Sequence, residues 1–232
     1  MLSILENFYG EDTVALIIQI TSYLLAVLFA LSIHEFAHAK VAFNQGDYTP
    51  KAQGRLTLNP FKHIDILGFI CLIICGYGWA KPVQVNPVKF KEYRKGFFLV
   101  SIAGVITNLA FSFIFAGIYV VLILCYPNVL LSSNSFVIYL YSFFIYFSLF
   151  FATINLCLFL FNLIPVFPLD GFNVINSFTK PNNKFVQFMV RYGSILLFGL
   201  ILVDSFTNLN MFSKVVNFLM GPIITFWTKV II

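Results

Sequence analysis

An apolar run over residues 13–43 constrains the fold of this chain more than any other feature of the sequence. If the run is helical throughout, it extends about 46 Å, which exceeds the roughly 30 Å of hydrocarbon in a bilayer. It is too long for the apolar core of a signal peptide, and the residues before it include Glu6, Glu11 and Asp12 but no lysine or arginine. We therefore expect a retained membrane helix with its acidic N-terminal side outside the cell.

The composition extends this expectation to the whole chain. Of the 232 residues, 60% are hydrophobic and 10% are charged, whereas a soluble domain carries about 25% charged residues. We expect one integral-membrane domain over residues 1–232, with a catalytic core at about 13–178 and accessory C-terminal helices at about 184–232. The net charge of +5 comes from clusters beside the apolar segments. Such clusters suit an anionic lipid surface better than nucleic acid.

Further apolar segments at residues 97–126, 136–161, 185–203 and 214–232 predict additional crossings. Segment 64–79 is apolar but short, and basic loops flank it on both sides. A full crossing would place one of those loops on the wrong side of the membrane, so we expect a re-entrant hairpin or bent half-helix that walls one side of the site. The prediction is five crossings plus this element, with six crossings as the alternative. The uncharged loops at 127–135 and 205–213 are expected outside.

The first apolar run ends in His34-Glu35-Phe36-Ala37-His38. Two histidines four residues apart lie on one helix face, about one turn from each other, and can direct ring nitrogens at one zinc ion. Glu35 lies about 100° round the helix, where its carboxylate can hold a water without being a ligand. A histidine in an apolar run is more often a hydrogen-bonded structural residue. This spacing, however, supplies two ligands and a base.

A catalytic zinc ion usually takes three protein ligands, so a third is needed. The remaining histidine, His63, lies in a polar loop near Asp65. Such a pair could shuttle protons or close a gate, but it is more often a solvated or capping interaction, and we do not assign it to the site. Asp170 is the stronger candidate, because it follows two prolines that interrupt a membrane helix. A lone carboxylate at the bilayer centre costs about 2.5 to 3.5 kcal/mol, which a metal ion would offset.

With these residues identified, the sequence resembles the site-2 protease family of intramembrane zinc metalloproteases. The resemblance rests on HEFAH for the family's HExxH motif, and on residues 162–171, NLIPVFPLDG, for its NxxPxxPxDG motif. Further similarity runs through residues 54–60, 78–83 and 101–104. One departure is Val105, where relatives commonly have proline. The resemblance covers residues from about 31 to 171.

The resemblance implies an all-α polytopic membrane protein with its zinc site between the first helix and the broken helix. His34, His38 and Asp170 are implied to bind one Zn²⁺ ion, and Glu35 to activate the water that attacks a peptide bond of a membrane-embedded substrate. Asn162 is implied to orient the substrate or stabilise the oxyanion. An alternative is that Asn162 satisfies carbonyl groups of the broken helix.

The implied partners are a single-span membrane protein or peptide as substrate, the lipid bilayer, and a regulatory membrane partner. The substrate helix must unwind before cleavage, and addition of the substrate as a strand to the 64–79 hairpin would meet that need. Lys40, Lys51, Arg55 and Lys62 predict that the site opens toward the cytoplasm. The compact chain, which leaves no room for an appended soluble domain, suggests the inner membrane of a prokaryotic cell. A metal transporter and a non-proteolytic metal-binding protein are the alternatives, because intramembrane His, Asp and Glu also line ion pathways.

Overall fold

The structure is a computed structural model that describes residues 13–75, 78–180, 183–207 and 211–232. Glu6, Glu11 and Asp12 lie outside this range. Within it, five helices are long and apolar enough to cross a membrane. They are α2 (Thr13–Asn44), α5 (Tyr93–Leu130), α6 (Ser135–Asn162), α8 (Lys184–Thr207) and α9 (Met211–Ile231). The predicted all-α fold is therefore confirmed, and the described residues contain as many candidate membrane-spanning helices as the five crossings that we expected.

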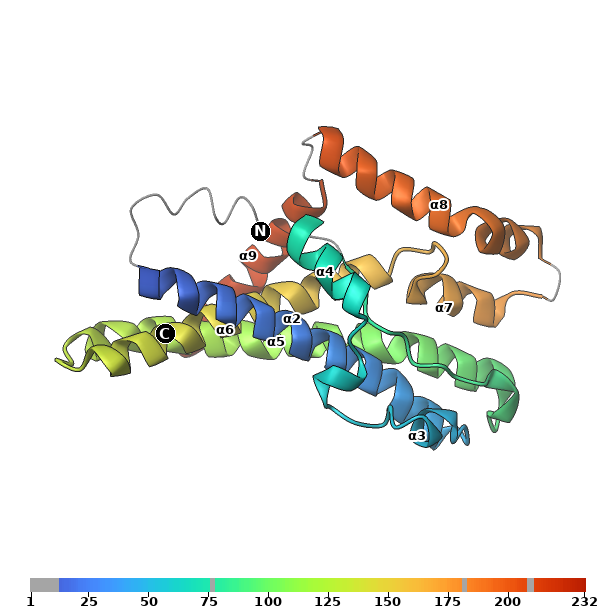
Figure 1. Ribbon diagram of the computed structural model, residues 1–232, viewed down its shortest axis with the longest axis horizontal. Helices are drawn as coiled ribbons and strands as arrows, with labels where there is room; N and C mark the ends of the chain where they lie inside the picture. Colours follow the sequence, from blue (N-terminus) through green and yellow to red (C-terminus); the bar gives the residue numbers. More distant parts are fainter. Residues whose placement is uncertain (1–12, 76–77, 181–182, 208–210) are drawn as a thin grey trace.

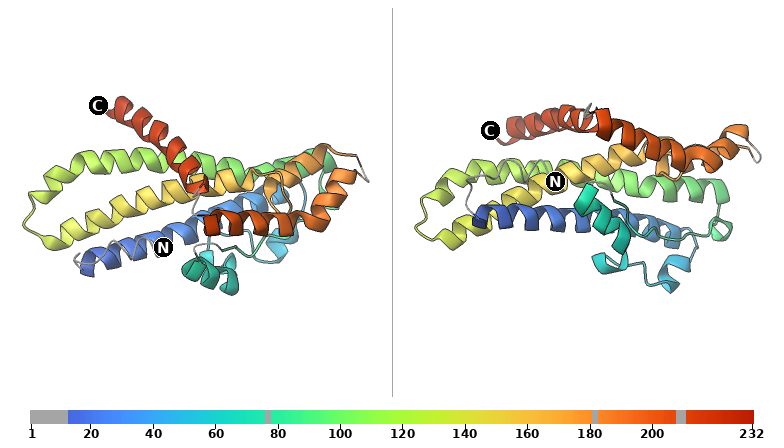
Figure 2. Two further views of the ribbon diagram at one scale, coloured as in Figure 1. Left: turned by 90° about the horizontal axis from the view of Figure 1, so that it is seen from above. Right: turned by 45° about the horizontal axis from the view of Figure 1, so that its top comes forward.

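Helices α2, α5 and α6 lie side by side and form the centre of the molecule (Figure 1, Figure 2). Ala26 and Ala30 of α2 are completely buried and belong to one cluster with Phe151 of α6. The Phe151 ring also packs on Phe115 of α5, with ring centroids 4.5 Å apart. Small residues allow membrane helices to approach closely, and packing drives their association in lipid. This contact fixes α2 relative to α5 and α6.

The segment that we expected to be re-entrant contains a short helix, α4 (Ile66–Cys75), which is not among the five candidate spans. Ile64 and Ala80 form an antiparallel bridge, and the Lys81 N–H donates to the His63 carbonyl at 2.8 Å. The chain therefore returns to the place from which it left, as a re-entrant element must. Residues 66–75 are helical rather than extended, so their backbone groups bond internally and offer no edge for an added strand.

The connection between α5 and α6 is shorter than the predicted loop at 127–135. Helix α5 continues through Pro127 to Leu130. Pro127 cannot donate a hydrogen bond to the carbonyl four residues earlier, but only three residues of the helix follow it, so little of the helix depends on that turn. Asn134 then caps α6, with its side-chain oxygen accepting the Phe136 N–H at 3.0 Å. The other predicted loop, at 205–213, is also shorter, since α8 reaches Thr207 and α9 begins at Met211.

The helix break predicted at the two prolines is present. Helix α6 ends at Asn162, and the chain turns before α7 (Asp170–Phe178) begins. Pro165 and Pro168 lack N–H groups and restrict the residues that precede them, so neither the α6 helix nor α7 can extend across this stretch. A Cβ atom at Gly171 would collide with the Leu163 carbonyl oxygen, so the start of α7 rests directly on the end of α6. Helix α7 also packs on α5, which brings Asp170 toward the interior.

Candidate metal centre

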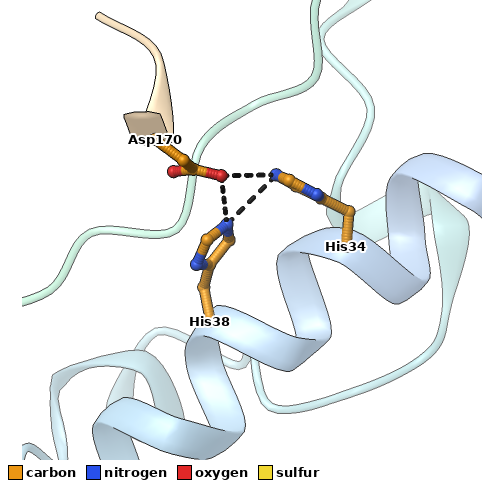
Figure 3. A group of neighbouring side chains, drawn as sticks. All are labelled: His34, His38 and Asp170. Atoms are coloured by element: carbon orange, nitrogen blue, oxygen red, sulfur yellow. Dashed lines mark hydrogen bonds and ion pairs between the residues drawn. The ribbon is translucent and has the colours of Figure 1, made fainter. Parts of the chain in front are cut away.

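Three side chains from two helices converge on one point (Figure 3). His34 and His38 are buried and one turn apart on α2, and Asp170 is the first residue of α7. The Nε2 atoms of the two histidines are 3.0 Å apart. Asp170 Oδ2 lies 3.3 Å from His34 Nε2 and 3.2 Å from His38 Nε2. The structure thus brings together the three residues that the sequence predicts as metal ligands.

The dimensions of this triangle fit a zinc ion. Zinc bonds of about 2.0 to 2.1 Å in a tetrahedron place the ligand atoms about 3.3 Å apart, close to the 3.0 to 3.3 Å found here. Asp170 Oδ2 is buried, and the two histidine Nε2 atoms beside it donate no hydrogen when they serve as metal ligands, which leaves the oxygen without a donor among the described residues. A buried carboxylate oxygen without a donor favours a cation beside it. Two imidazoles and a carboxylate are also a typical ligand set of catalytic zinc, with the fourth position left for water or substrate.

Helix α5 forms the wall behind the two histidine rings. Val100, Gly104 and Asn108 are spaced four residues apart and so share one face of this helix. The Val100 carbonyl lies 2.7 Å from His38 Nδ1, and the Asn108 side-chain amide lies 3.0 Å from His34 Nδ1. A Cβ atom at Gly104 would lie only 2.5 Å from His38 Nε2 and from His34 Cε1. The missing side chain of Gly104 therefore makes room for both rings.

Glu35 lies beside the metal ligands and is buried, with 9% of its surface exposed. One of its carboxylate oxygens, Oε2, accepts the Val83 backbone N–H at 2.8 Å. The stretch that contains Val83 is tied to the end of α2, because the Asn86 N–H donates to Asp47 Oδ2 at 2.6 Å. These contacts hold Glu35 next to the ligands, in the position predicted for the base.

The ligands and Glu35 open into a cavity of about 210 Å³. Its walls come from α2, α5, the extended stretch after α4 and the broken helix, and they include Pro82, Val83, Val85, Phe97, Ser101, Asn162, Pro168 and Asn173. Asn162 Nδ2 donates to the Leu158 carbonyl at 3.0 Å. This bond is the structural role considered for Asn162. The place of the same side chain in the cavity wall fits the substrate-positioning role.

His63 and Asp65 do not join the metal ligands. His63 is 1% exposed, so it is not the solvated residue that we considered, and its Nε2 lies 2.8 Å from the Thr57 carbonyl. Asp65 accepts the Gly68 N–H at 2.9 Å, at the start of α4. The capping interpretation of Asp65 is therefore correct. The histidine is a buried structural residue of the loop before α4.

Three further contacts of the site were not predicted. Asn108 carries a signal in the sequence, because it is a polar residue within an apolar helix and follows Gly104 by one turn. The other two contacts use the backbone N–H of Val83 and the backbone carbonyl of Val100. Every residue except proline has both of these groups, so only the fold selects them.

Two known proteins are similar to this chain in sequence. "Putative zinc metalloprotease YwhC" of Bacillus subtilis (strain 168) is 36% identical to this chain in an alignment of 205 positions that covers 82% of the chain and 90% of that protein. The chain belongs to the site-2 protease family. "Putative zinc metalloprotease Rip2" of Mycolicibacterium smegmatis is 30% identical over 117 residues, covering 47% of the chain and 45% of that protein. No family model and no solved structure matches the chain.

Proposed function

We propose that this protein is an intramembrane zinc metalloprotease that hydrolyses peptide bonds within or next to transmembrane segments. The observation that carries the proposal is that His34, His38 and Asp170 bring three possible zinc-ligand atoms together in the same cavity as Glu35. The helix that supplies both histidines is long and apolar enough to cross a membrane. The names of the two relatives support the metal and the class of reaction.

In this site, zinc supplies Lewis-acid activation of a water molecule and of the substrate carbonyl. Glu35 is the base. Among the described residues, Val83 is the hydrogen-bond donor to its carboxylate, and that bond uses Oε2. Oε1 is thereby left to take the proton of the attacking water and to return it to the leaving amine. The fixed Val83 contact keeps this carboxylate from rotating away during the transfer.

The cavity also determines how a substrate is presented. Asn162 Nδ2 carries two hydrogens, and the bond to Leu158 uses one of them. The second can donate to a substrate carbonyl, either to orient the chain or to stabilise developing negative charge. The substrate is a single-span membrane protein or peptide whose helix is locally unwound at the cleaved bond. Basic residues beyond the C-terminal end of the histidine pair favour a site that opens toward the cytoplasm.

The experiment compares purified wild-type protein with Glu35→Gln and Asp170→Ala, for bound zinc and for cleavage of a panel of single-span substrates. We expect Glu35→Gln to retain zinc and lose cleavage, because Glu35 is not a ligand. Asp170→Ala should bind less zinc and also lose cleavage. Glu92→Gln is the matched control, since Glu92 is exposed and pairs with Lys95 on the protein surface.

Three results would contradict parts of the proposal. If Glu35→Gln cleaves as fast as the wild type, Glu35 is not the base. If the wild type binds zinc but cleaves no substrate, while zinc crosses a vesicle membrane that contains the protein, the transport alternative is correct. Equal zinc content in Asp170→Ala and the wild type would remove Asp170 from the ligand set.

A further inference from the structure

The two histidine ligands have different neighbours at the ring nitrogen that points away from the metal position. His38 Nδ1 lies 2.7 Å from a backbone carbonyl, that of Val100. His34 Nδ1 lies 3.0 Å from Asn108 Nδ2, an amide nitrogen. Asn108 is completely buried, and its own oxygen, Oδ1, has no hydrogen-bond partner among the described residues. Asn108 is thus a buried polar side chain whose acceptor is unused and whose donor faces a histidine ring.

A carbonyl can only accept a hydrogen bond, so His38 carries its proton on Nδ1 and presents the lone pair of Nε2 to the metal. His34 needs the same tautomer to act as a ligand through Nε2. Its Nδ1 must then donate a hydrogen, and the partner of that hydrogen must be an acceptor. The amide nitrogen of Asn108 cannot fill this role, whereas its oxygen can.

The two ends of a carboxamide have nearly the same size and shape, so a half-turn of the Asn108 amide places Oδ1 where Nδ2 lies. Oδ1 then accepts the hydrogen of His34 Nδ1. One rotation therefore gives the buried oxygen a partner and leaves His34 Nε2 free for the metal.

Two further buried side-chain oxygens lie near the level of Asn108 in the bundle. Ser112 Oγ and Asn155 Oδ1 are two further buried atoms without partners among the described residues. Ser112 lies one turn beyond Asn108 on α5. Phe111 of α5 packs on Phe151 of α6, with ring centroids 6.0 Å apart. Because α5 and α6 are consecutive antiparallel helices, Asn155, one turn after Phe151, lies level with the turn of α5 that contains Asn108.

We propose that Asn108 is a positioning residue for the metal centre: its Oδ1 accepts the Nδ1 hydrogen of His34 and fixes the tautomer and ring orientation in which His34 binds zinc. The inference rests on the proposed function only in taking zinc as the bound metal. Together, Val100, Gly104 and Asn108 make one face of α5 a template for both histidines. A backbone carbonyl orients one ring, a side-chain carbonyl orients the other, and the glycine between them leaves the necessary space.

The test measures zinc affinity in detergent by competition with a chromophoric chelator, for wild type, Asn108→Asp, Asn108→Leu and Asn108→Ala. Outer contacts of this kind typically contribute about 10-fold to 100-fold in metal affinity. We expect Asn108→Leu and Asn108→Ala to lose affinity in that range. Asn108→Asp retains an acceptor oxygen and should bind zinc at least as tightly as the wild type. Ser148→Ala removes a buried hydroxyl that bonds to the Phe144 carbonyl of its own helix, so it is the control and should bind zinc normally.

A role in packing alone predicts a different pattern. A buried aspartate would then disturb the apolar interior at least as much as leucine, so Asn108→Asp would be the worse variant. Equal zinc affinity in the wild type and Asn108→Leu, or weakened binding in Asn108→Asp, would overturn the proposal. The zinc affinities of both variants are measured without any cleavage assay. A protein that binds zinc in this pattern but cleaves no substrate would contradict the protease function and leave the role of Asn108 intact.

A spectroscopic measurement covers the case in which the variants do not fold. The chain has 3 histidines, so ¹⁵N-histidine labelling of the wild type gives a spectrum simple enough to assign. We expect the zinc-bound protein to show His34 with its hydrogen on Nδ1, as for His38. A hydrogen on Nε2 of His34 would overturn the proposal.

Discussion

Helices α6 and α8 are both long apolar helices, yet they occupy different environments. The most apolar 18-residue stretches of the two helices have similar mean hydropathies, 2.2 for α6 and 1.9 for α8. In α6, 33% of this stretch is buried inside the protein, whereas in α8 only 6% is buried. The ligands come from α2 and α7, and both of these helices pack on α5. We call α2, α5, α6 and α7 together the packed half of the molecule. Hydropathy therefore identifies the helices that can cross the membrane but does not tell which of them build the site.

The kinds of residue at the helix contacts separate these two regions. The packed half contains buried small and polar side chains, including Ser22 and Ser32 on α2, Ser112 on α5 and Ser148 on α6. Such residues allow membrane helices to approach and bond to one another. On α8, a close contact with the rest of the protein is at Gly193, where a Cβ atom would lie 2.8 Å from the Phe167 carbonyl oxygen. Small and polar residues are thus better markers of the central region than hydrophobicity.

The largest effect is expected from Gly104→Ala. The new methyl group would lie 2.5 Å from ring atoms of both His34 and His38, so at least one ring must leave its position. We expect zinc affinity to fall by more than about 100-fold, since losing the geometry of a ligand costs more than losing an outer contact. Competition with a chromophoric chelator measures this change.

Gly117→Ala is the matched control for that variant. It makes the same substitution in the same helix, but its methyl group crowds the Trp227 ring, with 2.7 Å to Cε2, instead of the metal ligands. It should lower thermal stability and leave zinc affinity unchanged. If both variants lose zinc equally, the site depends on the general integrity of α5 and not on the space at Gly104.

A second prediction compares phenylalanines in the two regions. Phe151 is 2% exposed and contacts aromatic rings of α5, whereas Phe198 on α8 is 62% exposed. Phe151→Ala leaves a cavity among packed side chains and should destabilise the protein by about 3 kcal/mol. In Phe198→Ala, lipid fills the space, so little change is expected. Denaturation of both variants in the same detergent measures the difference, and equal losses would show that α8 is packed as well as α6.

Much of this architecture follows from local patterns in the sequence. The apolar segments predict the long helices, and the spacing of His34 and His38 places both on one helix face. The prolines before Asp170 predict the break that ends α6. The error at 127–135 has a local cause too, because a proline near a helix end suggests a loop although the last turn tolerates it.

Contacts between distant segments could not be predicted in the same way. The Val83 N–H meets Glu35 across 48 residues, and Asn108 meets His34 across 74. Both contacts depend on how α5 and the stretch after α4 pack on α2, and no local pattern encodes that arrangement. The resemblance to a family supplied the ligand set, but it gave no role to either of these residues.

A smaller effect on stability, which depends on pH, is expected at Asp47, just after the end of α2. Burial raises the pKa of its carboxyl, but hydrogen bonds from Asn86 and Thr49 and the charge of Lys89 outweigh this, and the net pKa lies below the usual value. A carboxyl group with a lowered pKa in the folded state stabilises the protein above its unfolded pKa of about 4, and this stabilisation is lost as the pH falls through the folded pKa.

At pH 7, Asp47→Asn should therefore melt a few degrees below the wild type, because the charged acceptor is lost. The difference should shrink when the pH falls below about 4, where protonation removes the same charge from the wild type. Melting temperatures of both proteins across this range provide the measurement. A difference that stays constant with pH would mean that the charge of Asp47 does not contribute.

The smallest effect is expected at the contact of α8 with the broken helix. In Gly193→Ala the methyl group meets the Phe167 backbone, so α8 must shift slightly, while Gly199→Ala on the same helix meets nothing within 4 Å. We expect Gly193→Ala to lower the melting temperature by a degree or two relative to Gly199→Ala. Zinc affinity should be unchanged in both, because the ligand group found among the described residues comes from α2 and α7. Identical melting temperatures would mean that α8 rests loosely against the core. A loss of zinc in Gly193→Ala would mean that α8 transmits its position through Phe167 to Asp170, and the division into a packed site and a peripheral helix would then be wrong.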